Sequence, residues 1–234
     1  MKREDIVRAA RTAFPYTIPI LAGFLFVGIA YGIFMRSLGF SAWYPILISV
    51  LVFAGSMQFV LGNLLTQPFD PLNALILTLL VNARHLFYGI SLLGQYQNLG
   101  AKRWYLMFGL CDETFSVNVS VEVPEGVDRG WFYFFITLFD NLYWILGTAL
   151  GALFGSFLTF DTKGILFVMT ALFLVIFTTQ WMRDTNHLPA LSGVGISLCA
   201  LLLVGAEHFV PVSMLGILLV LTLLRPYLEG RKRI

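Results

Sequence analysis

Apolar runs long enough to cross a lipid bilayer recur along this chain from about residue 14 to residue 224. A helix needs about 20 such residues to span the hydrocarbon core. Only 12% of the 234 residues are charged, whereas an ordinary soluble domain carries about 25%. A large soluble core does not explain so large a deficit. The sequence therefore predicts an all-α integral membrane protein with almost no soluble part.

Eight segments are expected to lie in the membrane as a single transporter domain covering residues 1–234. Turn-forming stretches such as QPFDP separate them. Some segments are predicted to be broken or re-entrant, because Ala54-Gly55-Ser56 interrupts the second and the fourth is short and carries two acids. The number of full crossings stays open. The segments are 14–35, 43–66, 71–93, 104–120, 131–158, 163–182, 188–205 and 209–224.

Basic residues at both ends of the chain predict that both termini are cytoplasmic, which requires an even number of crossings. Residues 1–13 are expected to form an interfacial amphipathic helix. If all eight segments cross, Lys102 and Arg103 lie outside, against the charge rule. If 43–66 and a counterpart in the second half are re-entrant, they lie inside. The terminal basic residues are Lys2, Arg3, Arg8 and Arg11, and then Arg225, Arg231, Lys232 and Arg233.

A weak internal similarity predicts possible repeat halves at about 14–120 and 131–224. VGIAYGIFM at 27–35 resembles LGTALGALF at 146–154, and each motif has two glycines four residues apart. An apolar segment with a Gln-aromatic pair follows each motif, at Gln58–Phe59 and Gln180–Trp181. Small residues at this spacing are also a common helix-packing device in membranes. Weak repeats are typical of secondary transporters.

The most informative stretch is LLVNARHLFYG at 79–89, which places Asn82, Arg84, His85 and Tyr88 deep inside an apolar segment. An arginine at the centre of the bilayer costs about 2.5–3.5 kcal/mol on insertion scales. A snorkelling arginine would avoid this cost only near the end of a span. We therefore expect Arg84 to have a buried partner or to face a polar cavity.

Asp112 and Glu113 interrupt another apolar run and are the obvious partners. Adjacent residues of a helix point about 100° apart, so one carboxylate can pair with Arg84 while the other faces a cavity. We expect one of them within salt-bridge distance of Arg84. The alternatives are a bridge that only joins two helices, or a site for a zwitterionic solute or a proton.

VFAGSMQF at 52–59 supplies Gly55, Ser56 and Gln58. The small residues predict a helix break at 54–56, where free N–H groups suit a carboxylate, although small residues also serve simple packing. We expect 54–58, 82–89 and 112–116 to converge on one polar cavity. Weaker candidates are Asp140 with Asn141, a second polar focus, and His187 and His208, which are expected at the interface.

The sequence contains none of the common motifs of enzymes, metal sites or nucleic-acid-binding proteins. The chain has no HExxH, no GxSxG, no phosphate-binding glycine loop and no metal-ligand spacing of histidines. The small net charge of +2 indicates nothing about nucleic acid, and the chain has no basic stripe, zinc-finger spacing or helix-turn-helix context that would indicate binding to it. Cys111 and Cys199 lie in apolar segments and form no disulfide framework. We therefore expect no enzyme activity, no cofactor and no metal.

In order and rough spacing, VFAGSMQF, LLVNARHLFYG and the DETF of residues 112–115 resemble the AzlC family of branched-chain amino acid exporters, which includes YgaZ-type permeases. The resemblance covers about the first half of the chain. It implies export of branched-chain amino acids, and in some members methionine, across the cytoplasmic membrane. It also implies a large subunit that works with a small, separately encoded AzlD-like membrane partner.

The predicted polar residues suit the substrate that this resemblance implies. Arg84 or the break near Gly55 is expected to meet the substrate carboxylate, and Asp112 or Glu113 its ammonium. Without a nucleotide-binding motif, uphill movement needs an ion gradient, most simply of protons, for which Asp112, Glu113 and His85 are candidates. The rival hypotheses are a passive channel for small zwitterionic solutes and a structural subunit of a transport complex.

Overall fold

The computed structural model describes residues 3–155, 167, 170–171, 174, 177–178, 181–182, 186–205 and 209–230. All regular secondary structure in these residues is helical, which confirms the predicted all-α class. Three of the described helices are long and apolar enough to cross a membrane. The chain divides into two compact units, Met1–Ala171 and Leu172–Ile234.

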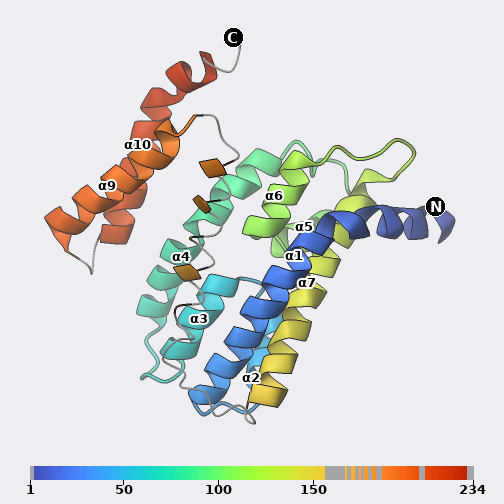
Figure 1. Cartoon of the computed structure of the whole chain (residues 1–234), viewed down its shortest axis with the longest axis horizontal. Helices are drawn as coiled ribbons and strands as arrows, with labels where there is room; N and C mark the ends of the chain where they lie inside the picture. Colours follow the sequence, from blue (N-terminus) through green and yellow to red (C-terminus); the bar gives the residue numbers. More distant parts are fainter. Residues whose placement is uncertain are drawn as a thin grey trace. The chain divides into compact units, whose positions relative to one another are not determined.

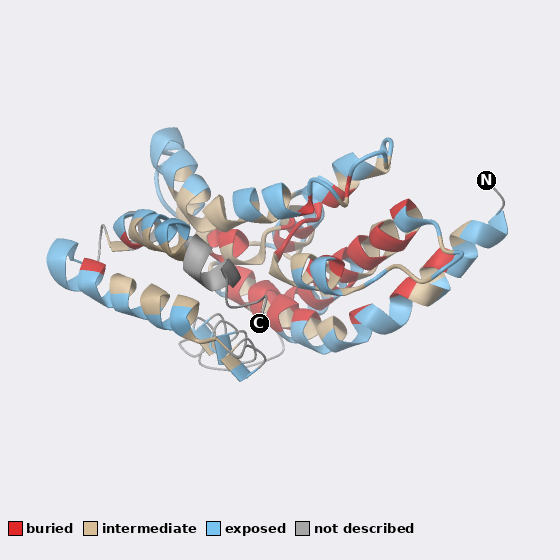
Figure 2. Cartoon of the chain, turned by 90° about the horizontal axis from the view of Figure 1, so that it is seen from above, coloured by how far each residue is buried: buried red, intermediate tan, exposed pale blue. Residues whose placement is uncertain are grey.

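Two long helices, α1 (Arg3–Ser37) and α7 (Arg129–Phe154), run side by side in the first unit (Figure 1). They are parallel, because the early residues of one helix contact the early residues of the other, and late residues contact late ones. The contacts pair Phe14 with Phe139, Phe24 with Trp144, and Gly32 with Gly151. Figure 2 shows buried and exposed positions alternating along α1 from its N-terminus, so this helix packs with one side.

Glycines four residues apart allow this close approach. A β-carbon on Gly28 would lie 3.0 Å from the backbone nitrogen of Thr148, and one on Gly147 would lie 2.8 Å from the carbonyl oxygen of Leu25. The two similar motifs at 27–35 and 146–154 therefore pack against each other, as small-residue motifs commonly do in membranes. The repeat itself stays a prediction, and Gln180 lies outside the described residues.

The segment 43–66 forms a broken helical hairpin. Helix α2 (Trp43–Leu51) runs from the C-terminal end of α1 to its middle, where Phe53 contacts Phe24 with ring centroids 6.1 Å apart. Helix α3 (Gly55–Leu64) then returns, so that a β-carbon on Gly62 would meet Phe34 near the end of α1. The predicted break is thus confirmed, with non-helical residues 52–54, two residues earlier than expected.

Helix α4 (Pro71–Leu92) runs back toward the N-terminal end of α1, where Leu92 joins a core cluster with Ala13. Its start follows from local chemistry. The Asp70 side chain accepts hydrogen bonds from the backbone nitrogens of Leu72 and Asn73, both at 3.1 Å, and proline occupies the first turn. This is a strong N-terminal signal.

A second broken hairpin follows, made of α5 (Lys102–Phe108) and α6 (Asp112–Ser120). Both of its outer ends lie where α7 begins. The Lys102 ammonium lies 4.8 Å from the ring centre of Trp131. Asn118 donates at 2.8 Å to the hydroxyl of Tyr96, whose ring centroid lies 6.0 Å from that of Tyr133. The predicted segment 104–120 is therefore an inward and a returning helix joined at residues 109–111, in place of one span.

The first unit thus alternates three full-length helices, α1, α4 and α7, with two hairpins that enter from opposite ends. Arg8 donates to the carbonyl oxygen of Gly126 at 3.1 Å, so the start of α1 and the loop before α7 lie at one end. Lys102 lies at the same end, because the segment 43–66 turns back and does not cross. This agrees with the second arrangement considered above, in which 43–66 is re-entrant. The counterpart expected in the second half is untested, since most of 163–182 lies outside the described residues.

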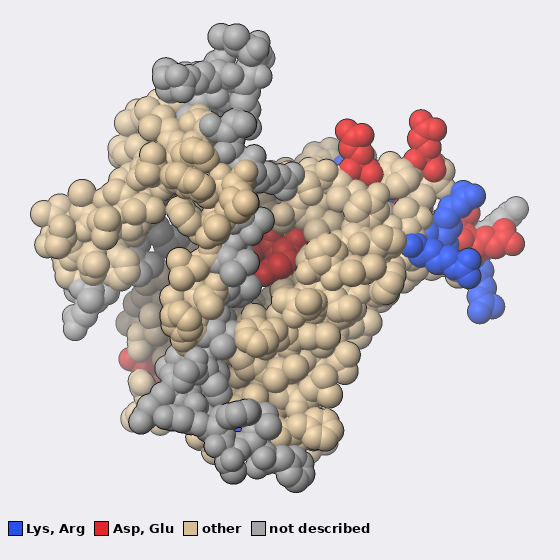
Figure 3. Space-filling view, in the orientation of Figure 1, with Lys and Arg blue, Asp and Glu red and all other residues tan. Residues whose placement is uncertain are grey.

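Charge distribution agrees with this arrangement. In Figure 3 the visible Lys and Arg side chains gather at the N-terminal end of the first unit, and most of the face beyond them is uncharged. The residues expected as an interfacial helix, 1–13, begin α1 without a break from residue 3, and Ala9 and Ala13 are fully buried. Their position at a membrane surface stays a prediction.

The second unit contains α9 (Leu188–Val204) and α10 (Phe209–Gly230). The two helices pack closely, since a β-carbon on Gly216 would lie 2.9 Å from Ile196. His187 stacks on Trp181 with ring centroids 4.0 Å apart, just before α9. His208 and the last basic residues, 231–233, lie outside the described residues.

Candidate substrate site at two helix breaks

Arg84, in the middle of α4, contacts both broken hairpins. Its Nε lies 3.0 Å from Oδ1 of Asp112, and its Nη2 donates to Oγ of Ser56 at 3.1 Å. Ser56 belongs to the first turn of α3, and Asp112 begins α6. The predicted contact between Arg84 and an acid is confirmed. The stretches 54–58, 82–89 and 112–116 come together at these contacts, and the polar cavity expected there stays a prediction.

Tyr88 lies one helical turn after Arg84 and holds the same carboxylate oxygen. Its hydroxyl donates to Oδ1 of Asp112 at 2.7 Å, and its ring stacks on Phe115 with centroids 4.2 Å apart. The side chain of Arg84 is 32% exposed and that of Asp112 is 20% exposed. The pair is therefore only partly buried.

The electrostatics of the two breaks differ. The first turn of α3 contains no acidic residue, whereas that of α6 contains Asp112 and Glu113. Free N–H groups at a helix start carry partial positive charge. Beside α3 this charge adds to the guanidinium of Arg84, while at α6 the two acids offset it. The site thus has a point suited to an anion near Ser56 and a point suited to a cation near Asp112.

Gln58 and Gly55 hold the first break against α7. Oε1 of Gln58 accepts from Nε1 of Trp144 at 2.9 Å, and its Nε2 donates to the carbonyl oxygen of Val52 within the break. Gln58 is fully buried. A β-carbon on Gly55 would lie 3.1 Å from the Trp144 ring. Both residues were predicted to bind substrate. Their contacts fit a role in shaping the break, and their binding role stays a prediction.

The second break lies in the segment 104–120, which was among those predicted to be broken or re-entrant without a position for the break, and Thr114 stabilises it. The Thr114 hydroxyl accepts from the backbone nitrogen of Cys111 at 2.8 Å and donates to the carbonyl oxygen of Gly109 at 2.9 Å. The signal was present in the sequence. A glycine three residues before paired acids, with threonine at the third helical position, is typical of a helix start.

The remaining predicted residues surround the Arg84 contact. Glu113 lies near enough to Asp140 of α7 to interact with it electrostatically, and the cavity that the second acid was expected to face stays a prediction. The His85 ring lies 5.8 Å from that of Tyr88. Oδ1 of Asn82 is buried without a hydrogen-bond partner among the described residues. Whether these side chains bind substrate or carry protons stays a prediction.

Replacing Tyr88 with phenylalanine is expected to lower thermal stability while keeping the ring stacked on Phe115. A hydrogen bond to a charged group contributes about 1.5–3 kcal/mol, and Asp112 loses one here. Thermal melting in detergent measures the change. Tyr16→Phe is the matched control, because that side chain is exposed and packs only its ring on Phe132. Equal melting temperatures for both variants would contradict the role assigned to the Tyr88 hydroxyl.

Discontinuous helices that meet near the middle of the membrane form the substrate sites of many secondary transporters, and the two broken hairpins of this chain have that character. The chain belongs to the AzlC protein family, whose family model matches residues 19–158. The predicted membership is thereby confirmed. No solved structure matches the chain.

Two relatives match nearly the whole chain, and a third matches part of it. The branched-chain amino acid transport protein AzlC of Bacillus subtilis is 59% identical over 228 residues, which are 97% of this chain and 90% of that protein. An uncharacterized membrane protein of Haemophilus influenzae is 48% identical, covering 97% of this chain and 94% of that protein. The inner membrane protein YgaZ of Escherichia coli is 30% identical over 60% of this chain and 58% of its own length.

Proposed function

We propose that this chain is a secondary-type transporter that exports branched-chain amino acids, and methionine, across the cytoplasmic membrane. The observation that carries the proposal is the contact of Arg84 with Ser56 and Asp112 at the two helix breaks. The name of the Bacillus subtilis relative, a branched-chain amino acid transport protein, supports the substrate class.

The substrate is expected to replace the internal ion pair. A zwitterionic amino acid carries a carboxylate that matches Arg84 and the start of α3, and an ammonium that matches Asp112. When it inserts between them, each protein charge exchanges one partner for another of the same sign. The buried charges therefore never stand unpaired, which keeps the cost of opening the pair low. The stacked rings of Tyr88 and Phe115 offer an apolar wall for the aliphatic side chain.

The family resemblance implies a small AzlD-like membrane partner, and α4 has a surface that suits such a partner or lipid. Apolar side chains along α4 are largely exposed, including Leu72, Leu79 and Leu86. We place the N-terminus in the cytoplasm, because the basic residues Arg8 and Lys102 lie at the same end of the first unit. The basic residues near the C-terminus favour the same side for that end. They are Arg225, Arg231, Lys232 and Arg233.

The test is flux of labelled leucine, isoleucine, valine and methionine in proteoliposomes containing the full chain, alone and with its small partner. We expect saturable counterflow of these amino acids and accumulation when a proton gradient is imposed. Labelled lysine is the control substrate, because its extra charge has no partner between Arg84 and Asp112.

Three outcomes would contradict the proposal. The first is no flux of any of the four amino acids in either preparation. The second is flux that never saturates and never accumulates solute against a gradient, which indicates a passive channel. The third is flux with the partner that stays at the wild-type level after both Arg84 and Asp112 are neutralised, which indicates a structural subunit.

A further inference from the structure

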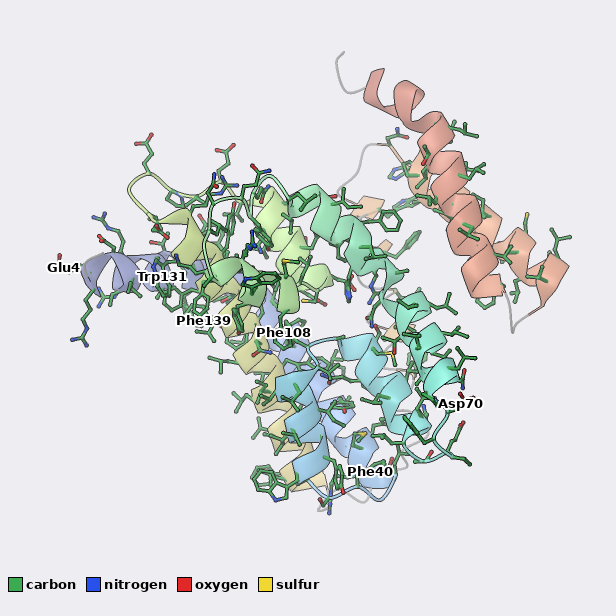
Figure 4. The ribbon with its side chains drawn as sticks, turned by 180° about the vertical axis from the view of Figure 1, so that it is seen from behind. Glu4, Phe40, Asp70, Phe108, Trp131 and Phe139 are labelled. Atoms are coloured by element: carbon green, nitrogen blue, oxygen red, sulfur yellow. The ribbon has the colours of Figure 1, made fainter. Side chains whose placement is uncertain are left out.

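Asp140 is an acid in the middle of α7 with an unusual environment. Its side chain is fully buried, and neither carboxylate oxygen has a hydrogen-bond partner among the described residues. Two polar neighbours on the same helix face also lack hydrogen bonds. Oγ1 of Thr137 and Nδ2 of Asn141 are buried without a hydrogen-bond partner among the described residues. Figure 4 labels Phe139, the residue before Asp140, and Phe108 at the end of α5, which packs on α7.

The groups that face Asp140 are neutral or acidic. Tyr105 of α5 and Glu113 of α6 interact with it electrostatically, and so does Cys111 at the break between these helices. The parts of α1 and α2 that pack on α7 carry tyrosines but no Asp, Glu, Lys, Arg or His between residues 14 and 35 or between 43 and 51. Within the described residues, therefore, no cation is recorded acting on Asp140.

An ionised carboxylate is costly in such a place. Burying an isolated charge without a partner costs several kcal/mol even after the protein relaxes, roughly on the scale that favours neutralising the group. Asp112 avoids this cost because Arg84 and Tyr88 hold it. Asp140 has no equivalent. A bound metal ion would be another solution, but no group of three His, Cys, Asp or Glu side chains that could hold one occurs in the described part of the chain.

Asp140 is also connected to the Arg84 site. Glu113 follows Asp112 on the first turn of α6 and interacts with both Asp112 and Arg84, while its charge also acts on Asp140. The break before α6 is fixed to α7, since Gly109 packs directly on Thr137. A substrate ammonium that replaces Arg84 beside Asp112 is expected to shift α6. Because Glu113 lies on α6 and Asp140 lies on α7, such a shift changes the distance between the Glu113 charge and Asp140.

We propose that Asp140 is protonated in this conformation and is the proton-carrying group that couples substrate movement to a proton gradient. This inference rests on the proposed transport function and assigns its coupling to Asp140, with Glu113 as the link to the substrate. The carboxyl gains its proton from one aqueous side, holds it while buried, and releases it to the other side when α6 moves.

The decisive variant is Asp140→Asn, because an amide resembles a protonated carboxyl in shape and has no charge to gain or lose. In proteoliposomes we expect substrate counterflow, which needs no net proton movement, to persist. Accumulation driven by an imposed proton gradient should be lost. Asp112→Asn should instead lose counterflow, because the substrate ammonium loses its partner. Glu125→Gln, at an exposed loop acid, is the control expected to keep both activities.

A second measurement does not depend on transport. The infrared C=O stretch of a protonated carboxyl should be present in the wild-type protein at neutral pH and weakened in Asp140→Asn, but unchanged in Glu125→Gln. If wild type carries no branched-chain amino acid, the proposed function fails, and this band still tests the protonation of Asp140. Proton-driven accumulation that survives in a folded Asp140→Asn protein overturns the inference while leaving the transport function intact. Accumulation that requires sodium and is lost in this variant overturns it too, since Asp140 would then hold a cation.

Discussion

Replacing Arg84 with alanine is expected to abolish transport of branched-chain amino acids while the protein still inserts in the membrane. The variant removes the guanidinium that is proposed to meet the substrate carboxylate, and among the described residues it leaves Asp112 with the Tyr88 hydroxyl as its hydrogen-bond partner. Losing a charged hydrogen bond weakens binding by about 1.5–3 kcal/mol, roughly ten- to a hundredfold per contact. Efflux of labelled leucine, valine, isoleucine and methionine from loaded cells that also express the partner measures the effect.

Arg84→Lys is expected to recover little of the lost transport. The guanidinium uses two different nitrogens, Nε toward Asp112 and Nη2 toward Ser56, and a single ammonium does not reproduce this fork. Arg103→Ala is the matched control, because that side chain lies at the start of α5 over the ring of Trp104. Unchanged efflux from a well-expressed Arg84→Ala protein would remove Arg84 from the substrate site and leave it a structural role.

Replacing Gly32 with alanine is expected to disrupt the packing of α1 on α7 and to lower the melting temperature of the purified protein strongly. The added β-carbon would lie 2.8 Å from the carbonyl carbon of Gly151 and about as close to the backbone of Ala152. Backbone atoms of a helix do not yield as the end of a flexible side chain does. Overpacking typically costs about 1–3 kcal/mol, and more where both partners are rigid.

Gly23→Ala is the control for this experiment, since Gly23 lies on the same helix and no atom within 4 Å would meet its β-carbon. Alanine forms helices better than glycine by about 1 kcal/mol in water, so this variant should keep or slightly raise the melting temperature. Similar losses in both variants would show that glycine serves the flexibility of α1 and that close packing is not the reason for its presence.

Several features of this protein could be predicted from the sequence because they follow from local chemistry. Apolar runs predict membrane helices without any knowledge of their partners. The turn formers before Pro71 predict where α4 starts, and the small residues near Gly55 predict a break that the structure contains. The cost of a charge in hydrocarbon predicts a buried partner for Arg84, and Asp112 and Glu113 lay in the next apolar segment along the chain.

Other features depend on contacts between segments far apart in the chain. The sequence of a broken segment does not show whether its second helix continues across the membrane or turns back. The two hairpins became evident only from contacts such as Gly62 with Phe34 and Asn118 with Tyr96. The short segment 104–120 with its two acids indicated a possible break, but its position at 109–111 became evident only from the folded chain. One partner of Gln58, Trp144 of α7, was likewise evident only from the folded chain.

The sequence by itself determined that this chain lies in a membrane, that its polar residues gather at a few points in apolar segments, and that Arg84 needs an acid. These follow from the transfer of side chains out of water, which depends on residue type and local spacing. Only the tertiary structure decided which acid pairs with Arg84 and which acid has no cationic partner among the described residues. Asp112, Glu113 and Asp140 carry the same charge in the sequence, and their different roles follow from which helix ends, hydroxyls and guanidinium the folded chain brings within a few ångströms of each.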